Sequence, residues 1–229
     1  MSDGIPVPLL SPAHVERATR PVDEPRHRPD MQLLDDDDLD RLADRLTRDR
    51  PRPLPVFAYG SLIWNPGFAV QASRRARAVG WHRQFMIHLD HFRGSAEQPG
   101  LMLALASGGC CEGLLLEIEA GTEPDSLRAL LRRELVAHEL AANAVWIEVD
   151  SDRGREQALT FYADPVGTTL AQLSVQEQAH RLARANGAAG SGAEYLHRTV
   201  HGLHQAGIHD PYIWELERLV AQDIDGWDR

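Results

Sequence analysis

The chain has 229 residues, of which 43% are hydrophobic and 25% charged, and its formal net charge is −10. These values are typical of a soluble globular protein with one domain, or one domain and an appendage. All 24 basic side chains are arginine, which excludes a Schiff-base lysine, a phosphate-loop lysine and a Ser-Lys dyad. The acidic balance favours neither nucleic acid nor an anionic membrane as a partner.

The cysteines and the hydropathy pattern bear on the compartment. The two cysteines, Cys110 and Cys111, are adjacent, so they are poorly placed for a disulfide and lack the CxxC spacing of metal or redox sites. The first residues do not combine a basic segment with an apolar core, and there is no run of about 18 apolar residues. We therefore expect a cytoplasmic protein with no membrane partner.

The first 50 residues differ in composition from the rest. Residues 1–32 carry six prolines among charged side chains, which predicts an extended, weakly ordered arm. Residues 33–50 have acids early, arginines late and leucines at helical spacing, which predicts a short amphipathic helix. The acidic cluster Asp35–Asp38 could bind a cation, but charge at a helix N-terminus explains it better. We expect 1–50 to be an N-terminal extension, partly disordered with a short acidic helix, and 51–229 to be the main domain.

Strands precede most helices in the remainder of the chain. Apolar and alternating runs predict strands over 56–59, 70–90, 145–149 and 158–162, and a hairpin over 101–119 that turns at Ser-Gly-Gly. Helical periodicity predicts helices over 123–140, 174–187, 193–206 and 211–222. This order is typical of an α+β fold.

The segment 57–68 is the first with possible chemistry. A short apolar strand runs into Gly60, where the lack of a Cβ lets a ligand or another chain approach the backbone closely. Exposed N–H groups at such a turn can hold a carboxylate or a developing oxyanion. Taken alone, the pattern is better explained as a turn with aromatic packing.

The predicted helix over 123–140 carries an inward-facing carboxylate. Its apolar stripe consists of Leu127, Leu130 and Leu131. Glu134 falls within roughly 20° of that stripe, whereas Arg132 and Arg133 are expected to point elsewhere. Burial raises a carboxyl pKa toward the range of a general base. A structural ion pair with an interior arginine such as Arg93 is the alternative interpretation.

The eleven histidines do not form a convincing metal site. His88 and His91 flank an aspartate, and His197, His201 and His204 share a helix face. Zinc at such a site requires a further ligand and an ordered second shell, and neither group has a companion cysteine or HExxH pattern. We therefore predict no metal.

Five segments in register resemble the ChaC-type γ-glutamylcyclotransferases. These segments are YGSLIWNPGF at 59–68, GWHRQF at 80–85, HFRGSAEQPG at 91–100, LLRRE at 130–134 and LSVQEQAHRLARANG at 173–187. The similarity covers about residues 54–222 and says nothing about residues 1–50.

The resemblance implies a fold and a set of site residues. The family fold is a compact α+β one, a small barrel-like mixed sheet with surrounding helices. The family's substrate-binding loop corresponds to Tyr59, Gly60, Ser61, Leu62, Ile63 and Trp64. Its catalytic glutamate, preceded by an arginine, corresponds to Glu134 after Arg133, and its RGTPE-like segment corresponds to residues 93–97. There Ser95 and Ala96 replace the usual Thr-Pro, which loosens the turn, while Arg93 is the candidate cation for a substrate carboxylate. Its late tyrosine corresponds to Tyr195.

The implied activity is cleavage of glutathione to 5-oxoproline and cysteinylglycine. The substrate's own amine attacks its γ-carbonyl, and Glu134 is the general acid and base. No metal or organic cofactor is required. Three alternatives remain. One is a cyclotransferase for other γ-glutamyl peptides or amines, and another is a non-catalytic γ-glutamyl-binding regulatory protein. A third is an adaptor role for residues 1–50 through Asp35–Asp38.

Overall fold

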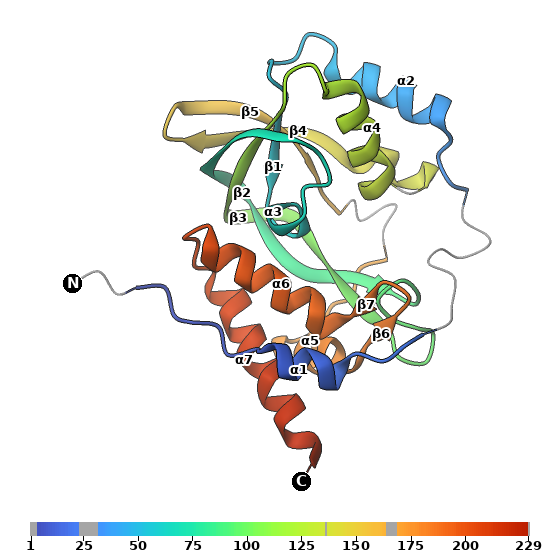
Figure 1. Cartoon of the computed structure of the whole chain (residues 1–229), viewed down its shortest axis with the longest axis vertical. Helices are drawn as coiled ribbons and strands as arrows, with labels where there is room; N and C mark the ends of the chain where they lie inside the picture. The colour runs from blue at the N-terminus through green and yellow to red at the C-terminus, as the bar shows by residue number, and fades with distance from the viewer. Residues whose placement is uncertain (1–3, 23–31, 136, 164–168, 229) are drawn as a thin grey trace. The chain divides into compact units, whose positions relative to one another are not determined.

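The computed structural model describes residues 4–22, 32–135, 137–163 and 169–228, and Figure 1 shows its elements. The chain forms two compact units. The barrel unit comprises Asp30–Gln84 and Ala104–Thr168. The helical unit comprises Met1–Pro29, Phe85–Leu103 and Thr169–Arg229.

Five strands close into a barrel in the order β1-β3-β2-β4-β5. They are β1 (Pro55–Ala58), β2 (Val70–Leu89), β3 (Gly100–Ile118), β4 (Ala144–Ser151) and β5 (Gly154–Phe161). Strand β1 is antiparallel to β3 and parallel to β5, where Val56 lies opposite Leu159. Closure removes the exposed sheet edges that a five-stranded sheet would otherwise present. The prediction of an α+β fold with a small barrel-like sheet is confirmed.

The predicted hairpin over 101–119 is wrong. Strand β3 runs continuously from Gly100 to Ile118. Gly108 and Gly109 have positive φ values of 101° and 75° within the strand. Glycine tolerates this conformation without reversing the chain, so the Ser-Gly-Gly sequence changes the strand locally and does not end it.

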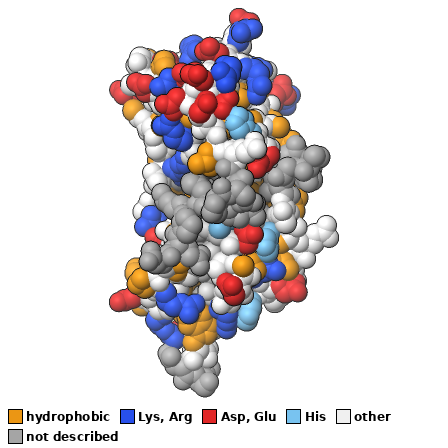
Figure 2. Space-filling view, turned by 90° about the vertical axis from the view of Figure 1, so that its right-hand side faces the viewer, with side chains coloured by type: hydrophobic (Ala, Val, Ile, Leu, Met, Phe, Trp, Pro, Cys, Tyr) orange, Lys and Arg blue, Asp and Glu red, His pale blue; other side chains and the backbone are white. Residues whose placement is uncertain are grey.

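Two helices of the barrel unit pack together on one apolar core. Helix α2 (Asp36–Thr47) and helix α4 (Glu123–Glu134) share this core. It includes the buried side chains of Leu39, Leu42, Leu46, Leu127, Leu130 and Leu131. Outside the core, Asp40 pairs with Arg128 at 2.5 Å and Asp36 pairs with Arg132. Figure 2 shows acidic and basic side chains intermingled at the top of the view.

The acidic cluster is bonded within the protein. Asp35 caps helix α2, and its side chain accepts a bond from the Asp38 amide at 2.8 Å. Asp38 in turn lies 2.5 Å from Arg41 and 3.1 Å from His138. The helix-terminus role predicted for this cluster is confirmed. The predicted helix over 123–140 ends earlier, at Glu134, and the 3-10 helix η1 (His138–Asn143) follows it.

Four helices make up most of the helical unit. They are α1 (Pro12–Ala18), α5 (Val175–Arg184), α6 (Gly192–Gln205) and α7 (Pro211–Asp225). The two-residue strands β6 (Asn186–Gly187) and β7 (Gly190–Ser191) pair between α5 and α6, and η2 (Gly226–Asp228) follows α7. The three helices predicted in this C-terminal part are confirmed.

The N-terminal segment differs from its prediction. The expected extended arm is wrong for residues 12–18, which form α1 after a Ser11 cap with Pro12 in the first turn. This segment lies across α6 and α7 in Figure 1. Leu10 is fully buried, and the amides of Leu9 and Leu10 donate to the carboxylate of Glu217 at 2.7–3.1 Å. Residues 23–31 of the expected arm lie outside the described residues, and the domain boundary at residue 50 stays a prediction.

None of the described helices is long and apolar enough to cross a membrane.

Candidate active site

The 59–64 turn is built where β1 ends. Gly60 precedes the one-turn helix α3 (Ser61–Trp64), and the Gly60 carbonyl accepts a bond from the Ile63 amide at 3.0 Å. Leu62 is buried in the apolar core of the barrel unit, with Ile63 packed against that core. Because a helix has no internal acceptors for its first amides, this turn directs N–H groups away from the helix. The 59–64 turn is therefore anchored by apolar side chains while its backbone can bind a ligand.

Two further bonds hold the start of the turn. The Tyr59 hydroxyl donates to the Phe161 carbonyl at 2.8 Å, on strand β5. The Tyr59 carbonyl accepts a bond from Arg83 Nη1 at 2.6 Å. Arg83 is buried in strand β2. It lies in the GWHRQF segment at 80–85, but its role was missed because the contact joins residues 24 positions apart in the sequence. Tyr59 is thus fixed by bonds to two other strands of the barrel, β5 and β2.

Glu134 is the last residue of α4 and lies on its inward face. The leucine stripe of α4 is buried as predicted, and 20% of the Glu134 side chain remains exposed. Burial raises the pKa of the Glu134 carboxyl above its usual value of 4.5, and the charge of Arg133 opposes this shift. Its ion-pair partner is Arg133, with Nε 3.2 Å from Oε1. The alternative pairing with Arg93 is not what the structure records.

Arg133 contacts the 59–64 turn, and the prediction that it points elsewhere is wrong. Its Nη2 donates to the Ser61 hydroxyl at 2.9 Å, and its Nη1 donates to the Asn65 carbonyl. Gly67, with φ of 74°, lies so close that a Cβ there would be 3.3 Å from Nη1. The structure thereby brings Glu134 and the predicted substrate loop together through one guanidinium.

Arg93 and Tyr195 lie together in the helical unit. Arg93 Nη1 donates to Glu194 Oε2 and to the Ser191 carbonyl, both at 3.0 Å. Its guanidinium carbon lies 5.2 Å from the centre of the Tyr195 ring, a cation–π geometry. Tyr195 itself is buried and packs edge-on against Phe85. These two candidates are neighbours, and Arg93 already has an acidic partner.

The Arg93–Glu97 segment keeps a closed turn despite its departure from the family pattern. The Ser95 amide donates to the Gln98 carbonyl at 3.0 Å, and the Gln98 amide donates to the Ser95 hydroxyl at 3.1 Å. The hydroxyl at position 95 therefore supplies the bond that closes this turn. The expected loosening of the turn is not seen.

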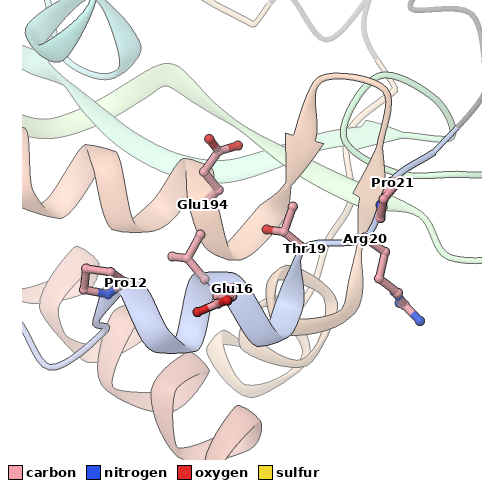
Figure 3. Close-up of a pocket in the computed structure, with 7 residues that line it drawn as sticks. Pro12, Glu16, Thr19, Arg20, Pro21 and Glu194 are labelled. Carbon is pink, nitrogen blue, oxygen red and sulfur yellow. The ribbon is translucent and has the colours of Figure 1, made fainter.

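Two further features are the histidine groups and a surface groove. His91 bonds Asp90 at 2.7 Å, and the ring of His197 lies 4.3 Å from that of His201. Within the described ranges, no group of three or more His, Cys, Asp or Glu side chains could hold a metal ion. A shallow groove of about 570 Å³ follows α1, and Glu194 is the residue of α6 that lines it (Figure 3). Its lining includes none of the predicted site residues.

The geometry around Glu134 suits proton transfer. A carboxyl group with a raised pKa can take a proton near neutral pH and return it in a later step. The neighbouring turn offers backbone donors and a serine hydroxyl to an anionic or developing anionic group.

Comparison with known proteins places this arrangement in a family. The family model described as "ChaC-like protein" matches residues 54–223. The chain is 35% identical to the glutathione-specific γ-glutamylcyclotransferase of Escherichia coli over 75% of this chain and 76% of the relative. It is 30% identical to the glutathione-specific γ-glutamylcyclotransferase 1 of Danio rerio, over 74% and 89% of the two chains.

A solved structure agrees in fold. The crystal structure of a γ-glutamyl cyclotransferase specific to glutathione from yeast superposes with a TM-score of 0.64 at 18% identity, over 74% of this chain and 96% of that one. The region that the family model matches, residues 54–223, contains the barrel, the 59–64 turn and α4. The chain belongs to the ChaC-like family of glutathione-specific γ-glutamylcyclotransferases.

Proposed function

We propose that this protein cleaves glutathione to 5-oxoproline and cysteinylglycine, with Glu134 as general acid and base. The observation that carries the proposal is the partly buried carboxyl of Glu134, whose pKa is raised by burial, held beside the 59–64 turn through Arg133. The names of the E. coli and Danio rerio relatives support glutathione as the substrate.

The reaction is an intramolecular cyclisation. Glu134 takes a proton from the α-ammonium group of the γ-glutamyl residue. The freed amine attacks the γ-carbonyl carbon, which forms the lactam C–N bond and places negative charge on the carbonyl oxygen. The C–N bond to cysteine then breaks, and Glu134 returns its proton to the departing amine. The ring nitrogen, which still carries two protons after the attack, gives one of them to the departing amine through the same carboxylate, so the lactam nitrogen keeps one proton and cysteinylglycine leaves with an ammonium group. Binding the substrate in one conformer, with its amine oriented toward its carbonyl, lowers the activation barrier relative to the reaction in water. In favourable intramolecular reactions this effect reaches about 7–11 kcal/mol.

The 59–64 turn and the arginines bind the substrate in this proposal. Backbone N–H groups from Gly60 to Leu62 hold either the α-carboxylate or the oxyanion, and Tyr59, Ile63 and Trp64 shape the site. Arg93, as the candidate cation for a substrate carboxylate, and Tyr195 remain proposed substrate-binding residues. No chemical step needs a covalent intermediate on the protein or a cofactor.

A glutamine substitution tests the role of Glu134. Glu134→Gln keeps the shape of the side chain but cannot accept the amine proton, so release of 5-oxoproline from glutathione should fall to background. Glu139→Gln is the matched control, because Glu139 is exposed five residues further along the chain. Full activity of Glu134→Gln would contradict the assignment. Tyr59→Phe and Ser61→Ala should have smaller effects, since backbone groups do part of the binding.

Substrate strictness needs a separate measurement. Release of 5-oxoproline should be compared for glutathione and γ-glutamylalanine at equal concentrations. A clear preference for glutathione supports the proposal, and equal rates would instead identify a general γ-glutamyl cyclotransferase. Binding of glutathione without turnover would identify a regulatory protein.

A further inference from the structure

Arg133 uses every nitrogen of its guanidinium within the protein. Nε faces the Glu134 carboxylate at 3.2 Å, Nη2 donates to the Ser61 hydroxyl at 2.9 Å, and Nη1 donates to the Asn65 carbonyl. Ser61 begins helix α3 and Asn65 ends it. One planar group therefore joins both ends of α3 to the last turn of α4.

From this geometry we propose that Arg133 is a positioning residue that ties the Ser61–Trp64 turn to the Glu134 carboxylate. The inference rests on the proposed function for its catalytic consequence, but the tie itself is independent of the substrate. The role proposed for Arg133 is positioning, because each of its three nitrogens is directed at a protein group.

Gly67 makes room for the guanidinium. A Cβ at this position would lie 3.3 Å from Arg133 Nη1, tighter than an ordinary contact, and the φ of 74° already favours glycine. A Cβ at position 67 therefore pushes the guanidinium by a few tenths of an ångström and strains the backbone beside Asn65, without removing any charge. This residue offers a second, independent way to perturb the same contact.

The other charged groups near this end of α4 have partners of their own. Arg132 pairs with Asp36, Arg128 pairs with Asp40, and His138 pairs with Asp38. Arg133 is the charge that opposes the effect of burial on the pKa of Glu134. Removing this charge must raise that pKa further, so a smaller fraction of Glu134 is ionised at neutral pH.

The test uses the full chain and four variants. Arg133→Met removes the charge and the donors, Arg133→Lys keeps the charge but lacks the planar fork, and Gly67→Ala displaces the guanidinium. Arg132→Met is the matched control, because it removes an adjacent arginine whose side chain is 56% exposed and pairs with α2. The measurements are kcat and KM for 5-oxoproline release as a function of pH, and amide hydrogen exchange of peptides covering residues 59–68.

The expected results separate position from charge. In Arg133→Met the amides of residues 59–68 should exchange faster, and kcat should fall about 100-fold. The acidic limb of the pH profile should move to higher pH. Arg133→Lys should leave that limb in place and lose less in kcat, and Gly67→Ala should lose kcat without moving the limb. Arg132→Met should stay within about two-fold of the wild type.

Two failures remain distinguishable. If Arg133→Met matches Arg132→Met in exchange over 59–68, Arg133 does not hold the turn and the inference is overturned. If the wild type releases no 5-oxoproline, the proposed function fails, while the exchange comparison still decides whether Arg133 ties the turn to α4.

Discussion

The N-terminal segment is bonded to the buried carboxylate of Glu217 on helix α7. We predict that this contact stabilises the folded helical unit. Only 1% of Glu217 is exposed, and it accepts backbone bonds from the amides of Leu9 and Leu10. Glu217→Gln replaces one acceptor oxygen by a donor that faces these amides. The change tests whether a segment outside the family match is part of the folded structure.

The expected loss follows from these contacts. A hydrogen bond to a charged group contributes about 1.5–3 kcal/mol, and a buried amide left without an acceptor costs a similar amount. Glu217→Gln should therefore lower the free energy of unfolding by about 2–3 kcal/mol. Leu10→Ala, at a fully buried side chain, should lower it by about 2–5 kcal/mol.

Urea denaturation of the full chain measures both losses. Glu215→Gln is the control for the carboxylate, because Glu215 is exposed on the same helix, and Leu9→Ala is the control for the leucine, because Leu9 is 58% exposed. Both controls should stay within about 0.5 kcal/mol of the wild type. Equal losses in Glu217→Gln and Glu215→Gln would refute the reasoning.

Three further predictions concern the barrel unit. Because folding raises the pKa of Glu134, the folded state binds more protons than the unfolded state above pH 4.5, and the ionised carboxyl lowers stability as pH rises. Glu134→Gln should therefore resist urea better than the wild type at pH 8, and this advantage should vanish below pH 4.5. Lower urea resistance of Glu134→Gln at pH 8 would contradict this sign. Leu39→Ala should lower the free energy of unfolding by about 2–5 kcal/mol through the shared core of α2 and α4, and a loss no greater than that of exposed Leu33→Ala in the same urea assay would count against that core. A thiol reagent should label Cys110 rapidly and Cys111 only on unfolding, which mass spectrometry of labelled peptides can check, and rapid labelling of both would be inconsistent with the burial of Cys111.

The sequence predicts elements well where periodicity and punctuation agree. The helices α5, α6 and α7 are amphipathic and separated by glycine or proline, so their positions follow from local signals. Helix α1 was missed because six prolines dominate the first 32 residues, although Ser11 followed by Pro12 is a helix-start signal. The sequence predicts two strands where β3 is continuous, because a Gly-Gly pair with positive φ occurs in turns and also within continuous strands.

Helical periodicity predicts only the part of the site that depends on local geometry. Glu134 was found because its side chain shares a face with three leucines, which is a local property. Arg133 was placed wrongly because its long side chain reaches a turn about 70 residues earlier, as the bond to Ser61 shows. Contacts of this kind, like that of Arg83 with Tyr59, depend on how the barrel closes and leave no pattern in the sequence.

The central claim is that the substrate's own amine, and not water, attacks the γ-carbonyl. The most direct test is to incubate the protein with reduced glutathione in water enriched in oxygen-18 and to identify the products by mass. The account predicts 5-oxoproline and cysteinylglycine in equal amounts, with no oxygen-18 in either product and no free glutamate. Glutamate carrying oxygen-18 in its side-chain carboxyl group would show hydrolysis by water and contradict the account.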